Sequence, residues 1–422
     1  MNIKRTVISC LFAAGAALSA SAVTLQVDQA RQRYPWNGLV DIDYTLTLEQ
    51  GETFGADDNL EVLMIDKDVT PAVTNRAITF LQAPLPMTAG KHRITWNANA
   101  DGVKVRTDKA EFRVEIAHYS EAYMIIDVSG GSTASVYRTT FVDRPPQGDF
   151  NVDEYKTDKI VLRRIHPGSY LAGSPDGEDG RNKDREAQHK VILSKPFYIG
   201  IFEITQKQYE NVMGNNPVST SSSASTDTGD TRPVTYVAYD SDIRGGGWPS
   251  SAYVAEGRFM RKLLDKCRSF DPDTGDYTVA VTGLDLPTEC QWEFACRAGT
   301  TGAFNKNEPL NSLGRYSGNT TDGAGGGFQT HTSVGSYRPN AFGLYDMHGN
   351  VWEVCLDWCD YTATPALVDP KGPTRGESRI MRGGSYANAE SACRSAQRGS
   401  CAVTWDAGRQ QGSGFRLCRT LP

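Results

Sequence analysis

The sequence has no strong excess of either charge and no long apolar segment. Its 422 residues include 44 lysines and arginines against 50 aspartates and glutamates, for a formal net charge of -6. Because nucleic-acid binding calls for a basic surface, we expect no nucleic-acid partner. No stretch approaches the ~18 apolar residues of a transmembrane helix, so we also expect no membrane-spanning segment.

Several common catalytic motifs are absent from the sequence. There is no Gly-x-Ser-x-Gly turn, no glycine-rich phosphate loop and no His-Glu-x-x-His zinc motif. The six histidines show no metal-binding spacing, and we interpret them as surface or loop residues: His92, His118, His166, His189, His331 and His348.

Residues 1–22 have the features of a signal peptide. Lys4 and Arg5 precede an apolar run, Val7–Leu18, which ends before the small-residue cleavage site Ala20-Ser21-Ala22. A lipoprotein site ending at Cys10 is a weaker alternative, since almost no apolar run precedes that cysteine. We therefore expect a secreted or periplasmic protein.

Cysteine is absent between residues 11 and 266. After removal of Cys10, an even number remains, all in the C-terminal part of the chain. In an exported protein this pattern predicts structural disulfides, but eight cysteines allow about 105 pairings, so their connectivity stays open. The cysteines are Cys267, Cys290, Cys296, Cys355, Cys359, Cys393, Cys401 and Cys418.

Residues 23–128 are predicted to form an all-β sandwich. The segment Val40–Leu46 alternates apolar and polar residues, as a half-buried strand does. Short strands separated by glycine, proline and asparagine turns are typical of a sandwich. The segment carries no catalytic motif, which favours a spacer or adhesion module, with carbohydrate binding as the alternative. The further candidate strands are 60–65, 92–96, 110–116 and 123–126.

A connecting segment, 129–159, is expected to run along a second domain at 160–422. Helical spacing is present over 251–270, and Thr288 is a suitable N-cap for a short helix through Cys296. Ser219–Asp230 and the glycine-rich Asp322–Gly327 are predicted loops. With few long regular elements, this domain should need cross-links to hold its core.

Several short sequence blocks follow one another in a defined order along this second domain. Their joint order over Val161–Leu421 resembles the formylglycine-generating enzyme (sulfatase-modifying factor) family. The resemblance implies an α+β domain of low regularity, with a variant of the C-type-lectin fold. The blocks are 165–174, 196–200, 203–206, 232–234, 286–297, 340–353, 382–386 and 414–417.

One of these blocks, Asp346–Glu353, is similar to a calcium site of the family. The resemblance implies a side-chain ligand at Asp346, backbone carbonyls at Gly349 and Val351, and a carboxylate at Glu353. Calcium prefers several such oxygens at close range, and glycine lets the chain turn sharply. The alternative is that Asp346 caps a turn and Glu353 is solvated.

A second calcium site of the family corresponds to Asn319. The family has an acidic ligand a little before Phe328, where this chain has Gly325-Gly326-Gly327. Asp322 is the nearest substitute, although its spacing differs. We keep Asn319 as the weaker calcium prediction.

The family's aerobic enzymes oxidise a cysteine of their target protein to formylglycine, using copper(I) held by two thiols. Soft thiolates suit copper(I). Here Gly383-Gly384-Ser385-Tyr386 is followed by Asn388 at the first thiol position, and Cys393 lies only approximately at the second. We therefore do not expect copper, and name Ser385, Cys393 and Trp352 only as candidate catalytic residues.

Other pairs of cysteines are possible metal ligands or disulfide partners. If residues 352–359 were helical, Cys355 and Cys359 would share a face, whereas the resemblance implies that Cys296 and Cys418 lie near a cross-link between the ends of the domain. The iron-dependent branch of the superfamily needs a His-x3-His-x-Glu motif, which this sequence lacks.

Two hypotheses follow from these observations. In the first, the domain is a calcium-stabilised module that binds an exported protein or glycan. In the second, it is an oxidoreductase that converts a cysteine of sulfatase-type substrates through a divergent metal site. The missing thiol pair favours the first hypothesis.

Overall fold

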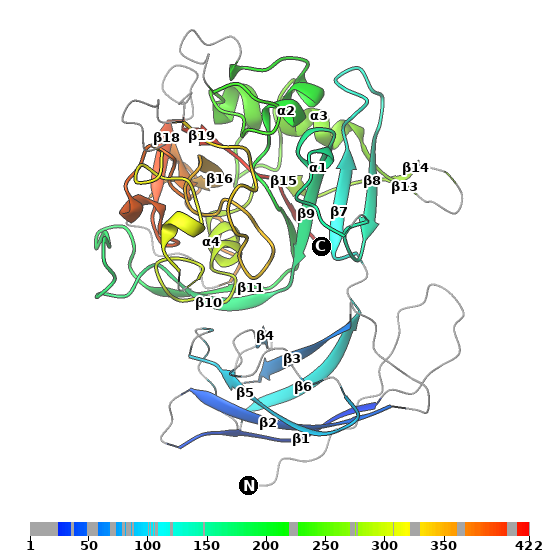
Figure 1. Cartoon of the computed structure of the whole chain (residues 1–422), viewed down its shortest axis with the longest axis vertical. Helices are drawn as coiled ribbons and strands as arrows, with labels where there is room; N and C mark the ends of the chain where they lie inside the picture. Colours follow the sequence, from blue (N-terminus) through cyan, green and yellow to red (C-terminus); the bar gives the residue numbers. More distant parts are fainter. Residues whose placement is uncertain are drawn as a thin grey trace. The chain divides into compact units, whose positions relative to one another are not determined.

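The computed structural model of the protein describes residues 24–34, 38–48, 58–67, 73–77, 81, 86, 88–99, 101, 103, 105, 109–118, 121–146, 148–218, 227–270, 275, 277–306, 308–320, 330–360, 368–402 and 412–421. These residues form two compact units (Figure 1). The first is built from the chain up to Ser120 together with Pro167–Tyr170, and the second from Glu121–His166 and from Leu171 onward. The predicted signal peptide and the loop 322–327 lie outside the described residues.

Strands far outnumber helices in both units. The strands of the first unit are β1 (Thr24–Gln32), β2 (Leu39–Thr47), β3 (Asp58–Asp66), β4 (Val73–Arg76), β5 (Gly90–Asn97) and β6 (Ala110–His118). Those of the second are β7 (Tyr123–Asp127), β8 (Tyr137–Val142), β9 (Lys159–Ile165), β11 (His189–Leu193), β12 (Phe197–Gly200), β13 (Cys267–Phe270), β14 (Tyr277–Ala280), β15 (Leu284–Asp285), β16 (Trp352–Trp358), β17 (Ser378–Arg382), β18 (Gly399–Ala402), β19 (Ser413–Gly414) and β20 (Cys418–Thr420). Strand β10 (Gly168–Ala172) is divided, because its residues up to Tyr170 belong to the first unit and Leu171 and Ala172 to the second. The α-helices are α1 (Glu154–Thr157), α2 (Gln206–Met213), α3 (Phe259–Lys266) and α4 (Glu289–Arg297), and short helical turns occur at Tyr239–Ile243, Leu310–Ser312 and Glu390–Cys393.

The first unit consists of two antiparallel three-stranded sheets around a shared apolar core. One sheet has the order β1-β2-β5 and the other β4-β3-β6. Ile42 and Trp96 from the first sheet and Val62 from the second belong to the same buried cluster. The predicted strands in this unit coincide with β2, β3, β5 and β6, and the predicted strand 123–126 coincides with β7. Assignment to a particular sandwich fold stays a prediction.

The second unit begins earlier in the chain than its predicted boundary. Its largest sheet has the order β14-β13-β8-β7-β9-β12-β20-β15. Within it, β7 pairs with both β8 and β9, and β8 pairs in parallel with β13. Because β7 buries Met124 and Ile126 in the core of this unit, residues 121–159 contribute strands and α1 rather than a linker alone.

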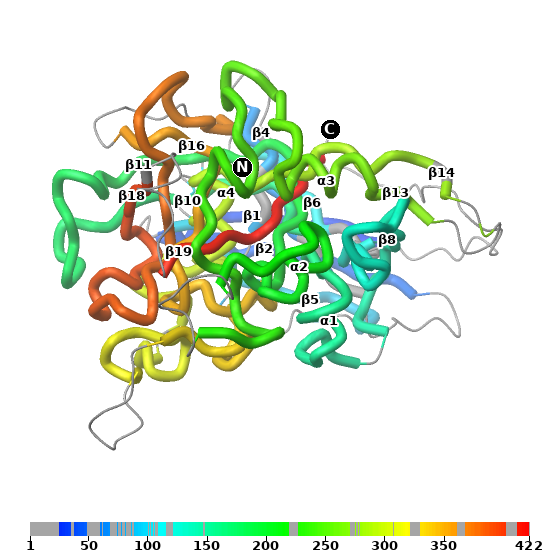
Figure 2. Tube along the Cα trace, turned by 90° about the horizontal axis from the view of Figure 1, so that it is seen from above, coloured from blue at the N-terminus to red at the C-terminus, as the bar shows by residue number. Residues whose placement is uncertain are grey.

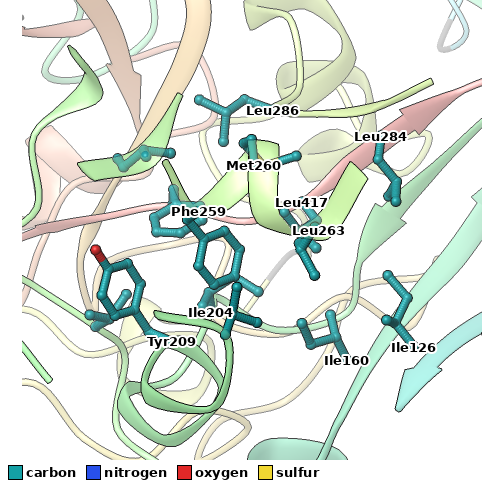
Figure 3. Close-up of a cluster of buried hydrophobic side chains, with 14 of the residues drawn as sticks. Ile126, Ile160, Ile204, Tyr209, Phe259, Met260, Leu263, Leu284, Leu286 and Leu417 are labelled. Atoms are coloured by element: carbon teal, nitrogen blue, oxygen red, sulfur yellow. The ribbon is translucent and has the colours of Figure 1, made fainter. Parts of the chain in front are cut away.

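Two helices pack side by side against this sheet and fill the core. The rings of Tyr209 in α2 and Phe259 in α3 are stacked, with centroids 5.3 Å apart. Figure 2 shows the two helices as neighbours, and Figure 3 shows Phe259 and Leu263 of α3 in an apolar cluster that includes Ile126, Ile160 and Leu284 of the sheet. The predicted helix over 251–270 is longer than α3, because Cys267 begins β13 and pairs with β8.

The predicted disulfide framework is not present in the structure. None of the eight cysteines forms a disulfide, and seven of them are buried; Cys359 is partly exposed. A buried cysteine behaves as a small apolar side chain. The core is held instead by one large apolar cluster and by ion pairs such as Arg394 with Glu186, both almost fully buried.

A second, four-stranded sheet carries the residues singled out from the sequence. Its order is β18-β17-β16-β19, and β16 contains Trp352, Glu353 and Cys355. Residues 352–358 are therefore a strand rather than a helix, and Cys355 and Cys359 do not share a helical face. No helix among the described residues is long and apolar enough to cross a membrane.

Candidate functional site

The Gly-Gly-Ser-Tyr block and the predicted calcium segment lie side by side. The N–H of Gly349 donates to the carbonyl of Gly383 (2.7 Å), and the N–H of Tyr386 donates to the carbonyl of Asn350 (2.9 Å). Gly349 has a φ of +85°, and a Cβ there would lie 2.0 Å from the carbonyl oxygen of Arg315. Glycine is therefore required at this crossing of two backbones.

Ser385 is held by Asn388 in a closed turn. The Oδ1 atom of Asn388 accepts from the Ser385 hydroxyl (2.7 Å) and from the Ser385 N–H (3.1 Å). The N–H of Asn388 donates back to the carbonyl of Ser385 (3.0 Å). Ser385 is only 3% exposed, so its hydroxyl is both buried and engaged.

Cys393 lies beneath this turn in an apolar environment. Its Sγ atom is 3.9 Å from the carbonyl oxygen of Ser385, and it packs in a buried cluster with Leu310 and Leu313. A Cβ at Gly384 would come within 2.7 Å of this sulfur. Burial raises the pKa of Cys393 to about 12, which keeps the thiol protonated at neutral pH.

Trp352 approaches the turn through its backbone rather than its ring. Its N–H donates to the carbonyl of Gly412 (2.7 Å), and a Cβ on Gly412 would lie 3.2 Å from Ser385 Oγ. The indole packs on Gly399, whose Cβ would lie 2.9 Å from the ring. The structure thus brings Ser385 and Cys393 together, with the Trp352 indole packed on β18.

Cys296 and Cys418 have separate surroundings. The sulfur of Cys296 is 3.7 Å from the carbonyl of Met347 and 3.9 Å from His348 Nε2, whereas that of Cys418 is 3.7 Å from Gln291 Oε1. Both are free thiols, so the cross-link implied by the resemblance is not formed.

Glu353 is fully buried and paired with Arg416. Its Oε1 atom accepts from Arg416 Nη2 (2.5 Å), and its Oε2 atom accepts from Arg416 Nε (2.5 Å) and Trp292 Nε1 (2.7 Å). Such a bidentate pair fixes the planes of both side chains. Glu353 is therefore not solvated, and both of its oxygens accept hydrogen bonds from the protein.

Asp346 lies in the same buried region but keeps one oxygen without a partner. Its Oδ2 atom accepts from the N–H of Gly335 (2.6 Å), while Oδ1 is buried with no hydrogen-bond partner among the described residues. Burial raises the pKa of Asp346 to about 6. An unpaired buried carboxylate oxygen is costly unless the group is protonated or binds a cation.

Glu203 is a third carboxyl group of this cluster, and sequence reasoning missed its role. It accepts from the N–H of Val351 (3.1 Å) and from Asn350 Nδ2 (2.6 Å). Burial, and then the charges of Asp346 and Glu353, raise its pKa well above the usual value. We call Glu203, Asp346, Glu353 and Arg416 the acidic cluster.

The signal for these missed partners is present in the blocks that carry the resemblance. Glu203 lies in 203–206, Trp292 in 286–297 and Arg416 in 414–417. A charged residue between two apolar residues, as Glu203 and Arg416 are, is a candidate for a buried pair, but the sequence alone does not reveal which blocks meet.

Around Asn319, backbone carbonyl oxygens accept hydrogen bonds from an arginine. Arg315 donates to the carbonyls of Asn319, Thr320 (3.2 Å) and Thr330 (3.2 Å). The Asn319 side chain accepts from the N–H of Tyr316 (2.9 Å) and donates to the carbonyl of Gly314 (2.9 Å). Asp322 and the glycines at 325–327 lie outside the described residues, so the second calcium site stays a prediction.

The second unit is rich in β-strands and has little helix, and its Gly-Gly-Ser-Tyr turn packs against a buried acidic segment. Comparison with known proteins assigns a domain of this kind to one family. The family model described as "Sulfatase-modifying factor enzyme 1-like domain" matches residues 147–421. The chain therefore belongs to this family, as the resemblance implied.

Individual relatives match different shares of the chain. The formylglycine-generating enzyme of Streptomyces coelicolor is 41% identical over an alignment of 121 positions, which covers 26% of this chain and 38% of that enzyme. The inactive Cα-formylglycine-generating enzyme 2 of Mus musculus is 30% identical over an alignment of 240 positions, which covers 52% of this chain and 72% of that protein. Among solved structures, PvdO from Pseudomonas aeruginosa matches with a TM-score of 0.47 and 24% identity, covering 62% of this chain and 94% of that one.

Proposed function

We propose that the second unit is an exported ligand-binding module that does not perform the copper-dependent oxidation of cysteine. The observation that carries this proposal is the state of the Ser385 turn, where Asn388 holds Ser385 and a single buried thiol, Cys393, lies near the Ser385 carbonyl. The chain's match spans only about two-fifths of the Streptomyces enzyme, 38% of its length, so the activity of that enzyme cannot be transferred by similarity alone.

The chemistry of the turn supports the loss of the copper site. Copper(I) prefers soft, deprotonated sulfur ligands. Asn388 offers an amide oxygen that already accepts from Ser385, and Cys393 is a neutral thiol packed against leucines. These residues do not fit a two-thiolate copper site.

The breadth of similarity to a relative named inactive is consistent with this proposal. The match to the mouse inactive protein spans 72% of its length. A family member without the oxidase chemistry can keep the fold and use its surface to bind an extended peptide or a glycan in the exported compartment. In this reading the first unit is a spacer or adhesion module.

Turnover with a cysteine-containing sulfatase peptide tests the proposal. The purified protein, with added copper(I), is incubated with the peptide under oxygen, and mass spectrometry is used to detect formylglycine. The proposal expects unmodified peptide, with a formylglycine-generating enzyme as positive control. Formation of formylglycine would establish the alternative, an oxidoreductase with a divergent metal site.

We also propose that calcium stabilises the domain at Asp346. The support is the unpartnered Oδ1 atom of Asp346 and the excess of three carboxyl groups over one guanidinium in the acidic cluster. Asp346 would supply a side-chain ligand, and Gly349 and Val351 their carbonyls. Glu353 would have to share its oxygens with Arg416.

Calcium dependence is measured from the melting temperature. We expect EDTA to lower the melting temperature and added calcium to restore it, and we expect Asp346→Ala to abolish the response. Glu377→Gln, an exposed site, serves as the control for a lost charge. Identical melting of the apo and calcium-loaded wild-type protein would refute the calcium assignment.

A further inference from the structure

The second unit contains a cavity of about 470 Å³ that the proposed function does not use. It is built from the β10–β11 connection, the first turn of α4, the end of β16 and residues 370–373. This volume is within the range of small-molecule sites. The Ser385 turn and the acidic cluster contribute no residue to the described lining.

The floor of the cavity is formed by four buried carboxyl groups, and three of them are neutralised by arginines. Glu186 pairs with Arg394 (2.8 Å). Glu289 pairs with Arg398 (2.7 Å), and Glu293 pairs with Arg297 (2.8 Å). Because these pairs satisfy both partners, none of the three glutamates is expected to attract a charged ligand.

The fourth carboxyl group, Asp357, has no such partner. It is 2% exposed, and its Oδ2 atom accepts from the N–H of Glu289 (2.7 Å). Within the described part of the chain, no cationic side chain lies at ion-pair distance from Asp357, and Oδ1 receives no hydrogen bond. A buried carboxylate in this state is stabilised by a cation that enters the cavity.

A glycine lies beside Asp357 in the wall of the cavity. Gly372, which lines the cavity, has a φ of +67°, and a Cβ there would lie 3.0 Å from Asp357 Oδ1. Apolar atoms from Trp358, Pro370 and Pro373 add to the lining, while Arg185 and Lys371 bring positive charge to its exposed part. A ligand would therefore meet a negative floor, apolar walls and a positive rim.

We propose that this cavity binds a primary ammonium group at Asp357, carried by a compound whose other end is a carboxylate. The ammonium donates to Oδ1, the aliphatic part packs on the prolines and Trp358, and the carboxylate is attracted by Arg185 and Lys371. A free ω-amino acid and a lysine side chain in an acidic peptide share this chemistry.

Calorimetric titration of the full-length protein tests this site. The probes are 6-aminohexanoate, hexylamine and hexanoate, used at pH 8, above the pKa of about 7 that burial gives to Asp357. We expect 6-aminohexanoate to bind best, hexylamine more weakly and hexanoate not at all. Binding of hexanoate as strong as that of 6-aminohexanoate would overturn the proposal.

Two variants locate the binding. Asp357→Asn keeps an acceptor for the Glu289 N–H and should weaken 6-aminohexanoate binding at least about tenfold, the loss typical of a charged hydrogen bond. Asp360→Asn removes a charge elsewhere in the lining and should change affinity less than about threefold, as an exposed ion pair does. Equal losses in the two variants would contradict a specific role for Asp357.

A third variant tests the cavity even if Asp357→Asn does not fold. Ala187 is an exposed lining residue, and Ala187→Phe should fill the entrance and abolish binding without changing the floor. Retained binding in a folded Ala187→Phe protein would argue against this cavity.

Peptide competition identifies the source of the ligand. If a lysine-containing acidic peptide displaces 6-aminohexanoate and its norleucine analogue does not, the ligand is a lysine side chain. If neither peptide displaces it, the ligand is the free amino acid. Neither copper nor calcium enters these measurements, so they stand apart from the tests of the proposed function.

Discussion

Arg416 carries the positive charge of the acidic cluster, and its replacement should lower the free energy of unfolding. Arg416→Met would leave Glu353 buried beside Glu203 and Asp346 without its bidentate partner. Breaking one partner of a buried pair costs about 3–5 kcal/mol. We expect a loss of this size in the free energy of unfolding, measured by urea denaturation.

An exposed ion pair provides the matched control for Arg416. Arg338 pairs with Glu308 at 3.2 Å, but the arginine side chain is 67% exposed. Arg338→Met should cost less than about 1 kcal/mol. Similar losses in the two variants would show that burial of the Arg416 pair does not matter.

Asp357 should make stability depend on pH. Burial, reinforced by the neighbouring Glu289, raises its pKa from 3.8 to about 7. Between these values the folded state holds a proton that the unfolded state has lost, so this residue lowers stability as pH rises from about 4 to 7. Asp357→Asn should therefore gain stability relative to wild type over that interval, by an amount on the order of a few kcal/mol. Urea unfolding at pH 5 and pH 8 measures the difference, and a constant difference would contradict the shifted pKa.

At the scale of elements, α4 was predictable because its start signal is local. Thr288 accepts from the N–H of Gln291 (3.2 Å), and Gln291 Oε1 accepts from the N–H of Thr288 (3.0 Å), which is a capping box. The same signal at Thr205 and Gln208 begins α2 and could have been used to find it.

Other elements depend on partners distant in the sequence. The helical spacing over 251–270 is interrupted at Cys267 because β8 offers a strand partner, and no local pattern reveals that partner. For the same reason, the pairing of Glu353 with Arg416 and the position of Glu203 in the acidic cluster could not be predicted from the sequence. The sequence blocks identify the family and the residues near its site, whereas long-range contacts decide which groups meet.

The cap of α4 can be tested by one substitution. Thr288→Ala removes the side-chain acceptor for the N–H of Gln291 and should lower the free energy of unfolding by about 1 kcal/mol. Thr282→Ala, at an exposed position, should change it by less than about 0.5 kcal/mol. Equal effects in chemical denaturation would mean that the cap contributes nothing.

At the scale of the whole molecule, the position of β7 sets the boundary of the second unit. A fragment of residues 121–422 retains β7 and β8, whereas a fragment of 160–422 loses both strands from within the eight-stranded sheet. We expect the longer fragment to melt cooperatively, and the shorter one to aggregate or to melt without a sharp transition, because it exposes unpaired strand edges. Circular dichroism during heating distinguishes the two outcomes, and equally cooperative melting would restore the boundary predicted near residue 160.

The absence of a two-sulfur copper site is tested most directly by copper(I) titration against a competing chelator. The reduced wild-type protein and Cys393→Ser are compared under anaerobic conditions, after the free thiols have been counted. Because Cys393 is a buried neutral thiol near the Ser385 carbonyl and Asn388 stands at the other thiol position, the two proteins should take up the same amount of copper(I) with the same affinity. One tightly held copper ion in the wild-type protein that is lost in Cys393→Ser would contradict the account.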